Sequence, residues 1–263
     1  MVVENLIKPQ WVVKDPLYAL YLGITLSFIG TSIGLFIFPE DASLAGILFT
    51  TLAGATFLLK VLDYVEESKG VWHKNFFVRN KNIALTYALF FVGITISYLI
   101  WYLILPPAAS RIFFSKQIAV ISSPIASLAG FVGLFKGAGS ATFALIVANN
   151  LKLVLVCLVL SLVYGAGAVL IITWNASVLG IFLGSLGRFT TALTFLPHTA
   201  LEFIGFFLAA MAGGLLSLAF VPDKVKIGSE KFNRVLKDAA ILFIIAVAVI
   251  IIAALIEVYI VMA

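Results

Sequence analysis

Charge is the scarcest feature of this sequence. Only 11% of the 263 residues are charged, whereas 63% are hydrophobic and the mean hydropathy is +1.17. Soluble domains carry about 25% charged residues, so this chain lacks the polar surface that would keep it dissolved in water. Its length accommodates about six to eight spans of ~20 apolar residues. The composition therefore predicts an integral membrane protein and excludes a soluble globular domain.

Cysteine is nearly absent as well. The one cysteine, Cys157, lies inside an apolar run. A single cysteine excludes disulfides within the chain and metal sites built on paired cysteines. The sequence also shows no phosphate-binding loop, cofactor fingerprint or Ser or Cys nucleophile motif. We therefore expect no metal and no cofactor, and we lean against an enzyme without excluding one.

The charges that are present are mostly basic. The formal net charge is +5, and residues 60–81 and 224–237 each contain five Lys or Arg. These segments lie between apolar runs, which is the pattern of cytoplasmic loops in membrane proteins. No basic run interleaved with aromatic residues indicates a nucleic-acid surface. The partners we expect are the lipid bilayer and either other copies of the chain or other membrane proteins.

The apolar runs set the expected helices. Four of them are continuous and long enough to span, namely residues 17–38, 42–62, 83–105 and 239–263. The first two are separated only by Pro39, Glu40 and Asp41, which predicts an antiparallel hairpin. The run at 141–172 would form a helix of ~48 Å, so it must tilt, project or break.

These runs predict an all-α, polytopic transmembrane helical bundle with about seven crossings, within a range of six to eight. Short or broken helices are expected around residues 112–135 and 176–188. Residues 1–263 would form one membrane domain. If all basic segments lie in the cytoplasm, the protein is a multi-pass cell-membrane protein with its N-terminus inside and its C-terminus outside.

A polar group inside a membrane span indicates function or a specific partner, because hydrocarbon does not solvate it. Glu202 is the clearest example, and His198 precedes it by four residues on the same helical face. We expect Pro197 to open this helix, since proline suits a first helical position. The face continues through Gly205, Ala209 and Gly213, which predicts close packing of another helix.

A second face of small residues includes Gly180 and Gly184. It follows Asn175, which we expect to cap the N-terminus of that segment. If the two glycine-lined faces meet, Asn175 would lie near His198 and Glu202. Amides from Asn149 or Asn150 could complete a polar cluster.

Two alternatives stay open for these residues. His198 could lie at the headgroup level, with Glu202 only ~6 Å deeper by helical rise. Asn149, Asn150 and Lys152 could form the interfacial start of a span, with the Lys152 side chain extending towards the headgroups.

The sequence resembles the stage II sporulation protein M (SpoIIM) family over residues 140–222. The resemblance is carried by the segments Ala148–Lys152 and Trp174–Ala176, and most strongly by Leu196–Glu202 with its His-x-x-x-Glu spacing. Thr199 and Ala176 stand where glycine is typical of the family. Residues 1–139 resemble no family that we can identify.

The resemblance implies a polytopic membrane protein that assembles into a larger membrane complex, as the namesake does in cell-wall remodelling during engulfment. It also implies that the polar cluster consists of Asn149 or Asn150, Asn175, His198 and Glu202. The leading hypothesis is therefore a non-catalytic subunit or scaffold. A transporter or channel component is the first alternative. An intramembrane hydrolase that uses His198 and Glu202 is the second.

Overall fold

The computed structural model describes residues 8–67, 76–122, 139–164, 167–186, 189–220 and 227–262. Within these ranges the chain is almost entirely helical and contains no strand. Its elements are α2 (Pro9–Lys14), α3 (Leu17–Ile37), η1 (Pro39–Asp41), α4 (Ala42–Glu67), α5 (Phe76–Ile104), α6 (Pro107–Phe113), α7 (Ser115–Ile121), α9 (Gly139–Tyr164), α10 (Val169–Ser185), α11 (Phe189–Phe220) and α12 (Glu230–Met262).

Six of the described helices are long and apolar enough to cross a membrane. Their candidate spans lie in α3, α4, α5, α9, α11 and α12, and α10 is a shorter apolar helix of 17 residues. The prediction of an all-α polytopic bundle with six to eight crossings is therefore confirmed. If α10 also crosses, the number of crossings is seven.

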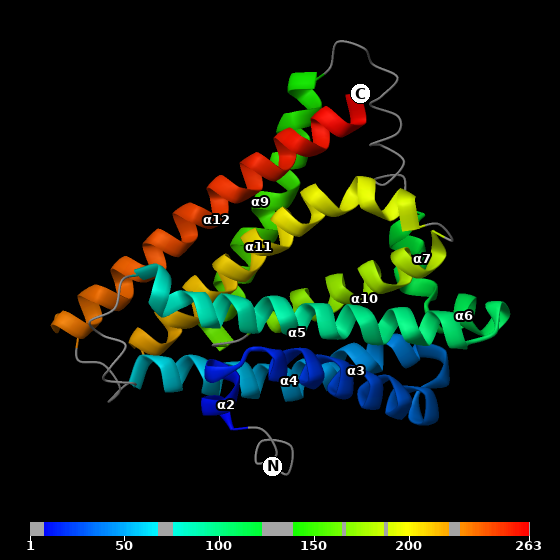
Figure 1. The fold of residues 1–263 in the computed structure, drawn as a ribbon, viewed down its shortest axis with the longest axis horizontal. Coiled ribbons are helices and arrows are strands. Elements are labelled where there is room, and N and C mark those ends of the chain that lie inside the picture. The colour runs from blue at the N-terminus through cyan, green and yellow to red at the C-terminus, as the bar shows by residue number, and fades with distance from the viewer. Residues whose placement is uncertain are drawn as a thin grey trace.

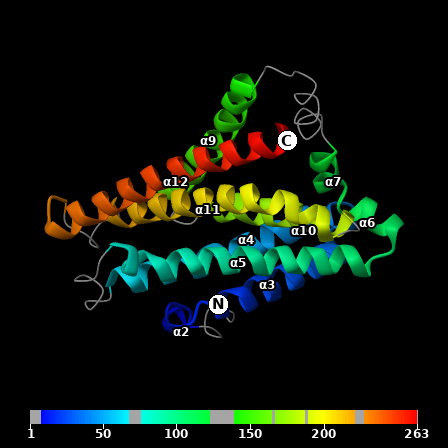
Figure 2. The ribbon, with the colours of Figure 1, turned by 45° about the horizontal axis from the view of Figure 1, so that its top comes forward.

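The helices form two groups that share few contacts. In the first group, which we call the α5 group, α3 packs on α4 and α5, and α10 packs on α5 and α4. In the second, which we call the α11 group, α11 packs on α12 and α9, and α12 also contacts α9. Figures 1 and 2 show that the two groups converge at one end, where α11 approaches α5.

Glycine lets the backbones of the α5 group approach one another. A Cβ atom on Gly93 would collide with the carbonyl oxygen of Leu20 and lie 3.1 Å from the Cα of Gly23. A Cβ on Gly23 would collide in turn with the carbonyl oxygen of Phe90. Small residues allow such close backbone approach between membrane helices. At this crossing the helices α3 and α5 therefore touch through main-chain atoms, which have little room to move.

The long apolar run at 141–172 breaks into two helices, which is one of the three outcomes expected from its length. Helix α9 ends at Tyr164 and α10 begins at Val169. Gly167 lies in the turn between them, where a Cβ would collide with the carbonyl oxygen of Leu160. In the region around 112–135, α7 is a short helix as expected, and residues 123–138 lie outside the described part of the chain. The short helix α6 lies mostly before this region.

Two predicted helix starts are wrong. Asn175 lies inside α10 instead of before it, and its Nδ2 donates to the carbonyl oxygen of Ile171 at 2.7 Å. Pro197 lies inside α11, which begins at Phe189 and bends in Figure 1. Asn and Pro mark helix ends in water, because water can bond to the N–H and C=O groups that a helix end leaves unpaired. In an apolar environment no water is present, so a helix that continues through Asn or Pro leaves fewer backbone groups unpaired. Segment 176–185 is accordingly continuous with the start of α10.

Candidate functional site: a hydrogen bond between two membrane helices

The polar residues of the α11 group meet between α9 and α11. Asn150 of α9 is only 6% exposed, and its Nδ2 donates to Oε1 of Glu202 on α11 at 2.6 Å. Further along the same pair of helices, Gly213 packs against Leu158 and Ser161. Since residue numbers rise together at both contacts, α9 and α11 run parallel. The Asn150–Glu202 bond therefore ties together two parallel helices that are separated in sequence by α10.

Two further titratable side chains accompany Glu202. His198 lies one turn earlier on α11 and is 8% exposed. Glu257 of α12 is half-buried and close enough to act electrostatically on Glu202. A carboxylate pair on neighbouring helices, with an amide donor beside it, can share a proton or attract a cation. In the described part of the chain, no three His, Cys, Asp or Glu side chains are grouped so that they could hold a metal ion.

The other two asparagines of the predicted cluster show different surroundings. Asn149 adjoins Asn150 in sequence but is exposed on α9. Asn175 donates within its own helix, and α10 packs mainly on α5 and α4. Asn150 is thus the asparagine that contacts Glu202, and a meeting of Asn175 with His198 stays a prediction.

The glycine-lined faces of α10 and α11 have different neighbours. The Cβ position of Gly180 lies 2.6 Å from the carbonyl oxygen of Thr95 on α5, and that of Gly184 lies 2.5 Å from the Tyr102 ring. On α11, Gly205 packs against Ile250 of α12 and Gly213 against α9, while Ala209 is fully buried. The two faces therefore do not meet each other through these residues, because each is directed at a helix from elsewhere in the sequence.

A second polar network was missed by the sequence analysis. Gln117 of α7 is fully buried, accepts a hydrogen bond from Ser43 Oγ at 3.1 Å and donates to Ser177 Oγ at 3.3 Å. It links α4, α7 and α10. The signal in the sequence is a glutamine within a mostly apolar stretch, in the region where short or broken helices are expected. The network holds the short helix α7 inside the α5 group.

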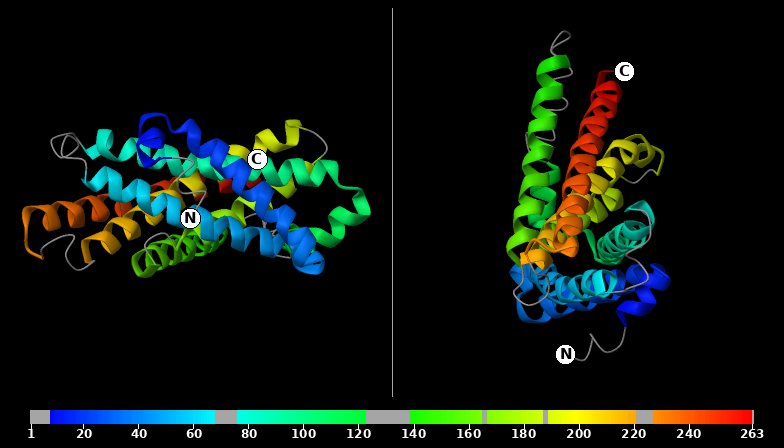
Figure 3. Two further views of the ribbon diagram at one scale, coloured as in Figure 1. Left: turned by 90° about the horizontal axis from the view of Figure 1, so that it is seen from below. Right: turned by 90° about the vertical axis from the view of Figure 1, so that its left-hand side faces the viewer.

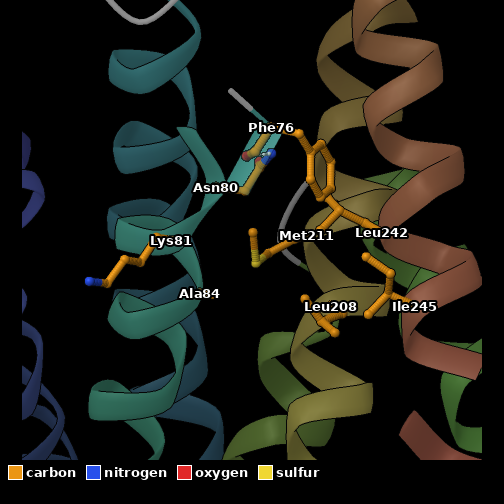
Figure 4. Close-up of a pocket in the computed structure, with 8 residues that line it drawn as sticks. All are labelled: Phe76, Asn80, Lys81, Ala84, Leu208, Met211, Leu242 and Ile245. Atoms are coloured by element: carbon orange, nitrogen blue, oxygen red, sulfur yellow. Dashed lines mark hydrogen bonds between the residues drawn. The ribbon is translucent and has the colours of Figure 1, made fainter. Parts of the chain in front are cut away.

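A groove of about 420 Å³ lies where the two helix groups converge. Figure 4 shows Met211 and Leu208 of α11 directed towards α5, whereas the Lys81 side chain points away. Its lining is Phe76, Asn80, Lys81, Ala84, Leu208, Met211, Leu242 and Ile245, so it is largely apolar. None of the residues of the predicted polar cluster lines it. The groove does show that the N-terminal end of α5 lies beside α11 and the N-terminal half of α12.

Comparison with known proteins identifies the family. No curated protein and no solved structure matches the chain. The family model described as Stage II sporulation protein M matches residues 86–261. This range contains residues 140–222 and extends into α5 on one side and through α12 on the other, so it includes Asn150, Glu202 and Glu257. Because more than half of the chain is matched, the protein belongs to the stage II sporulation protein M (SpoIIM) family of integral membrane proteins.

Proposed function

We propose that this chain is a non-catalytic subunit, or scaffold, of a membrane complex. The observation that supports the proposal is the use made of its buried polar groups. Asn150 and Glu202 bond across two helices at 2.6 Å, and Gln117 bonds across three. Each therefore contributes to helix association, which is what interhelical hydrogen bonds do in membranes. Family membership agrees with the role that the sequence resemblance implied.

The mass of the particle in native membranes tests this proposal. The tagged chain is extracted directly into lipid nanodiscs with a styrene–maleic acid copolymer, and the protein mass of each particle is measured. A stoichiometric assembly above the 28.3 kDa of one chain is the expected result. A particle that contains a single copy and no second protein would overturn the scaffold role.

One observation favours a second candidate, coupled transport of protons or cations. Glu257 of α12 lies close enough to act electrostatically on Glu202 of the adjacent helix α11, and carboxylates inside membrane spans occur in ion pathways. In proteoliposomes, a transporter would show a proton or sodium flux that Glu202→Gln abolishes. A single-copy particle with such a flux would place transport ahead of the scaffold role.

We also propose that the N-terminus is cytoplasmic and the C-terminus lies outside. Support comes from Asn82, whose Nδ2 bonds to the carbonyl oxygen of Val13 at 2.7 Å and so holds the N-terminal segment at the first turns of α5. The groove brings the same end of α5 beside α11 and α12. The basic segments 60–81 and 224–237 flank these helix ends, as one cytoplasmic side would require.

Labelling of single cysteines tests the orientation. In a Cys157→Ala background, Glu40→Cys and Lys81→Cys place one exposed thiol at each end of the bundle. A maleimide that does not cross membranes should label position 40 in intact cells and position 81 only after lysis. Labelling of position 81 in intact cells would reverse the orientation.

A further inference from the structure

Helix α9 is the least covered of the long helices. Only 17% of its most apolar window is buried, compared with 67% for α11. The inner side of α9, which contains Asn150, Val154, Cys157 and Ser161, faces the other helices of its group. The right-hand view in Figure 3 shows α9 beside α12 at the edge of the molecule. Most of its circumference therefore faces lipid or another protein.

The opposite side of α9 carries a regular exposed stripe. Its members recur at spacings of three and four residues, which places them on one face of the helix. We call it the outer stripe, and it consists of Leu145, Asn149, Lys152, Val156, Val159 and Val163. Four of the six side chains are aliphatic, so the stripe suits an apolar environment except at Asn149 and Lys152.

Lipid alone does not account for these two polar side chains. Asn149 and Lys152 lie six and nine residues inside the candidate span Phe143–Tyr164, about 9 and 14 Å along the helix. Lysines near helix ends reach the headgroups, but this rise exceeds the length of a lysine side chain, and asparagine is shorter still. Within the described part of the chain neither side chain has a hydrogen-bond or ion-pair partner. A helix of another protein, packed on the outer stripe, could supply a partner to both groups at this depth.

We infer that the outer stripe of α9 is the docking surface for a transmembrane helix of a different protein, which carries an Asp or Glu opposite Lys152. A carboxyl group is the complement of the Lys152 ammonium, and it can also accept a hydrogen bond from the Asn149 amide. The aliphatic residues on either side would pack against the same partner helix.

A second copy of this chain does not fit the same surface. Copies in one membrane share an orientation, and a symmetric pair would contact through equivalent residues around a two-fold axis. Contact through the outer stripe would then bring Lys152 close to Lys152 of the other copy, where like charges repel in a medium of low dielectric constant. The inference deepens the scaffold proposal, since it names the surface and the chemistry of the partner.

Synthetic helices test the chemistry of the surface. The purified chain, with Cys157→Ala and a donor dye on Ala144→Cys, is reconstituted into phosphatidylcholine and phosphatidylglycerol vesicles. Leucine–alanine transmembrane peptides carry an acceptor dye and a single Asp, Leu or Lys at the depth of position 152. Energy transfer should show association with the Asp peptide about fivefold or more tighter than with the Leu peptide. The Lys peptide should associate no more tightly than the Leu peptide.

A matched pair of variants locates the effect. Lys152→Met should abolish the preference for the Asp peptide, whereas Lys116→Met, which removes an exposed cation from α7, should leave it unchanged. The melting temperature of each variant confirms that it is folded. Equal binding of the Asp and Leu peptides to the original chain would overturn the inference, as would an undiminished preference in Lys152→Met.

Cross-linking tests the alternative of self-association. With Val159→Cys in the Cys157→Ala background, oxidation in native membranes should give no disulfide-linked pair of chains. An efficient cross-link between copies would overturn the inference in favour of a homodimer. If the peptide test fails but the particle in native nanodiscs contains more than one chain, the docking surface is wrong and the scaffold role stands. A single-copy particle would remove the scaffold role itself.

Discussion

The contact of α3 with α5 and the contact of α11 with α12 are made by different kinds of atoms. In the α5 group, the central contact of α3 with α5 is made by backbone atoms at Gly23 and Gly93. On α11, by contrast, Gly205 meets side-chain atoms of Ile250 of α12, although Gly213 meets the backbone of Leu158 on α9. Backbone contacts cannot adjust without moving a whole helix, whereas side chains can change rotamer. The comparison predicts that the α3–α5 contact is rigid, whereas the α11–α12 contact at Gly205 can adjust.

Gly93→Leu should have the largest effect, because it forces apart the backbones of α3 and α5. Overpacking of a core typically lowers the free energy of unfolding by about 1–3 kcal/mol, and this site has little room to relax. The measurement is thermal unfolding in detergent. Val92→Leu provides the control, since the neighbouring side chain is 42% exposed. Equal melting temperatures for the two variants would mean that the α3–α5 contact is not rigid.

Gly213→Leu should have the next largest effect. A Cβ at this position already collides with the carbonyl oxygen of Leu158, so a larger side chain would separate α11 from α9. We expect a loss of about 1–2 kcal/mol in the free energy of unfolding, because α9 lies at the edge and can shift outward. Ile204→Leu, at a position 41% exposed on the same helix, is the matched control. A neutral Gly213→Leu would show that α9 is held only loosely.

The Asn150–Glu202 hydrogen bond should contribute less to the free energy of unfolding, and its contribution can be measured separately. A double-mutant cycle of Asn150→Leu, Glu202→Leu and the double variant measures their coupling in the free energy of unfolding. Interhelical hydrogen bonds in membranes give about 0.6 kcal/mol on average and about 2 kcal/mol at most. A coupling in this range is expected, and Asn149→Leu in place of Asn150→Leu should give none. A coupling near zero for Asn150 would remove the bond from the description of the site.

The smallest effect is expected from Gly205→Ala. The added methyl group would meet the Cδ1 and Cγ1 atoms of Ile250 at 2.8 Å, and a rotamer change of that side chain can relieve the contact. The melting temperature should fall by less than half of the decrease caused by Gly93→Ala, measured in the same detergent. A larger decrease at position 205 would show that the α11–α12 contact is as rigid as the α3–α5 contact.

The sequence predicted the membrane class and the helical fold, because hydrocarbon constrains both strongly. It assigned Asn149 or Asn150, Asn175, His198 and Glu202 to one polar cluster, and the structure shows one bond among these residues, from Asn150 to Glu202. It misplaced the starts of α10 and α11, since the rules for Asn175 and Pro197 come from helices whose ends meet water. It also could not pair the helices. Glycine at positions 180 and 205 indicates a close neighbour, but only the three-dimensional arrangement shows that the neighbours are α5 and α12.

The separation of Asn150 from Glu202 has a consequence for biosynthesis. The two residues are 52 positions apart, with α10 between them, so α9 leaves the ribosome well before α11. During that interval the Asn150 amide must remain in the translocation channel, bond temporarily to another helix, or face lipid without a partner. A helix whose partner has not yet been synthesised can pair with the wrong helix or be degraded. Assembly of the α11 group would then be completed only after synthesis of its last helices, later than that of the hairpin formed by α3 and α4.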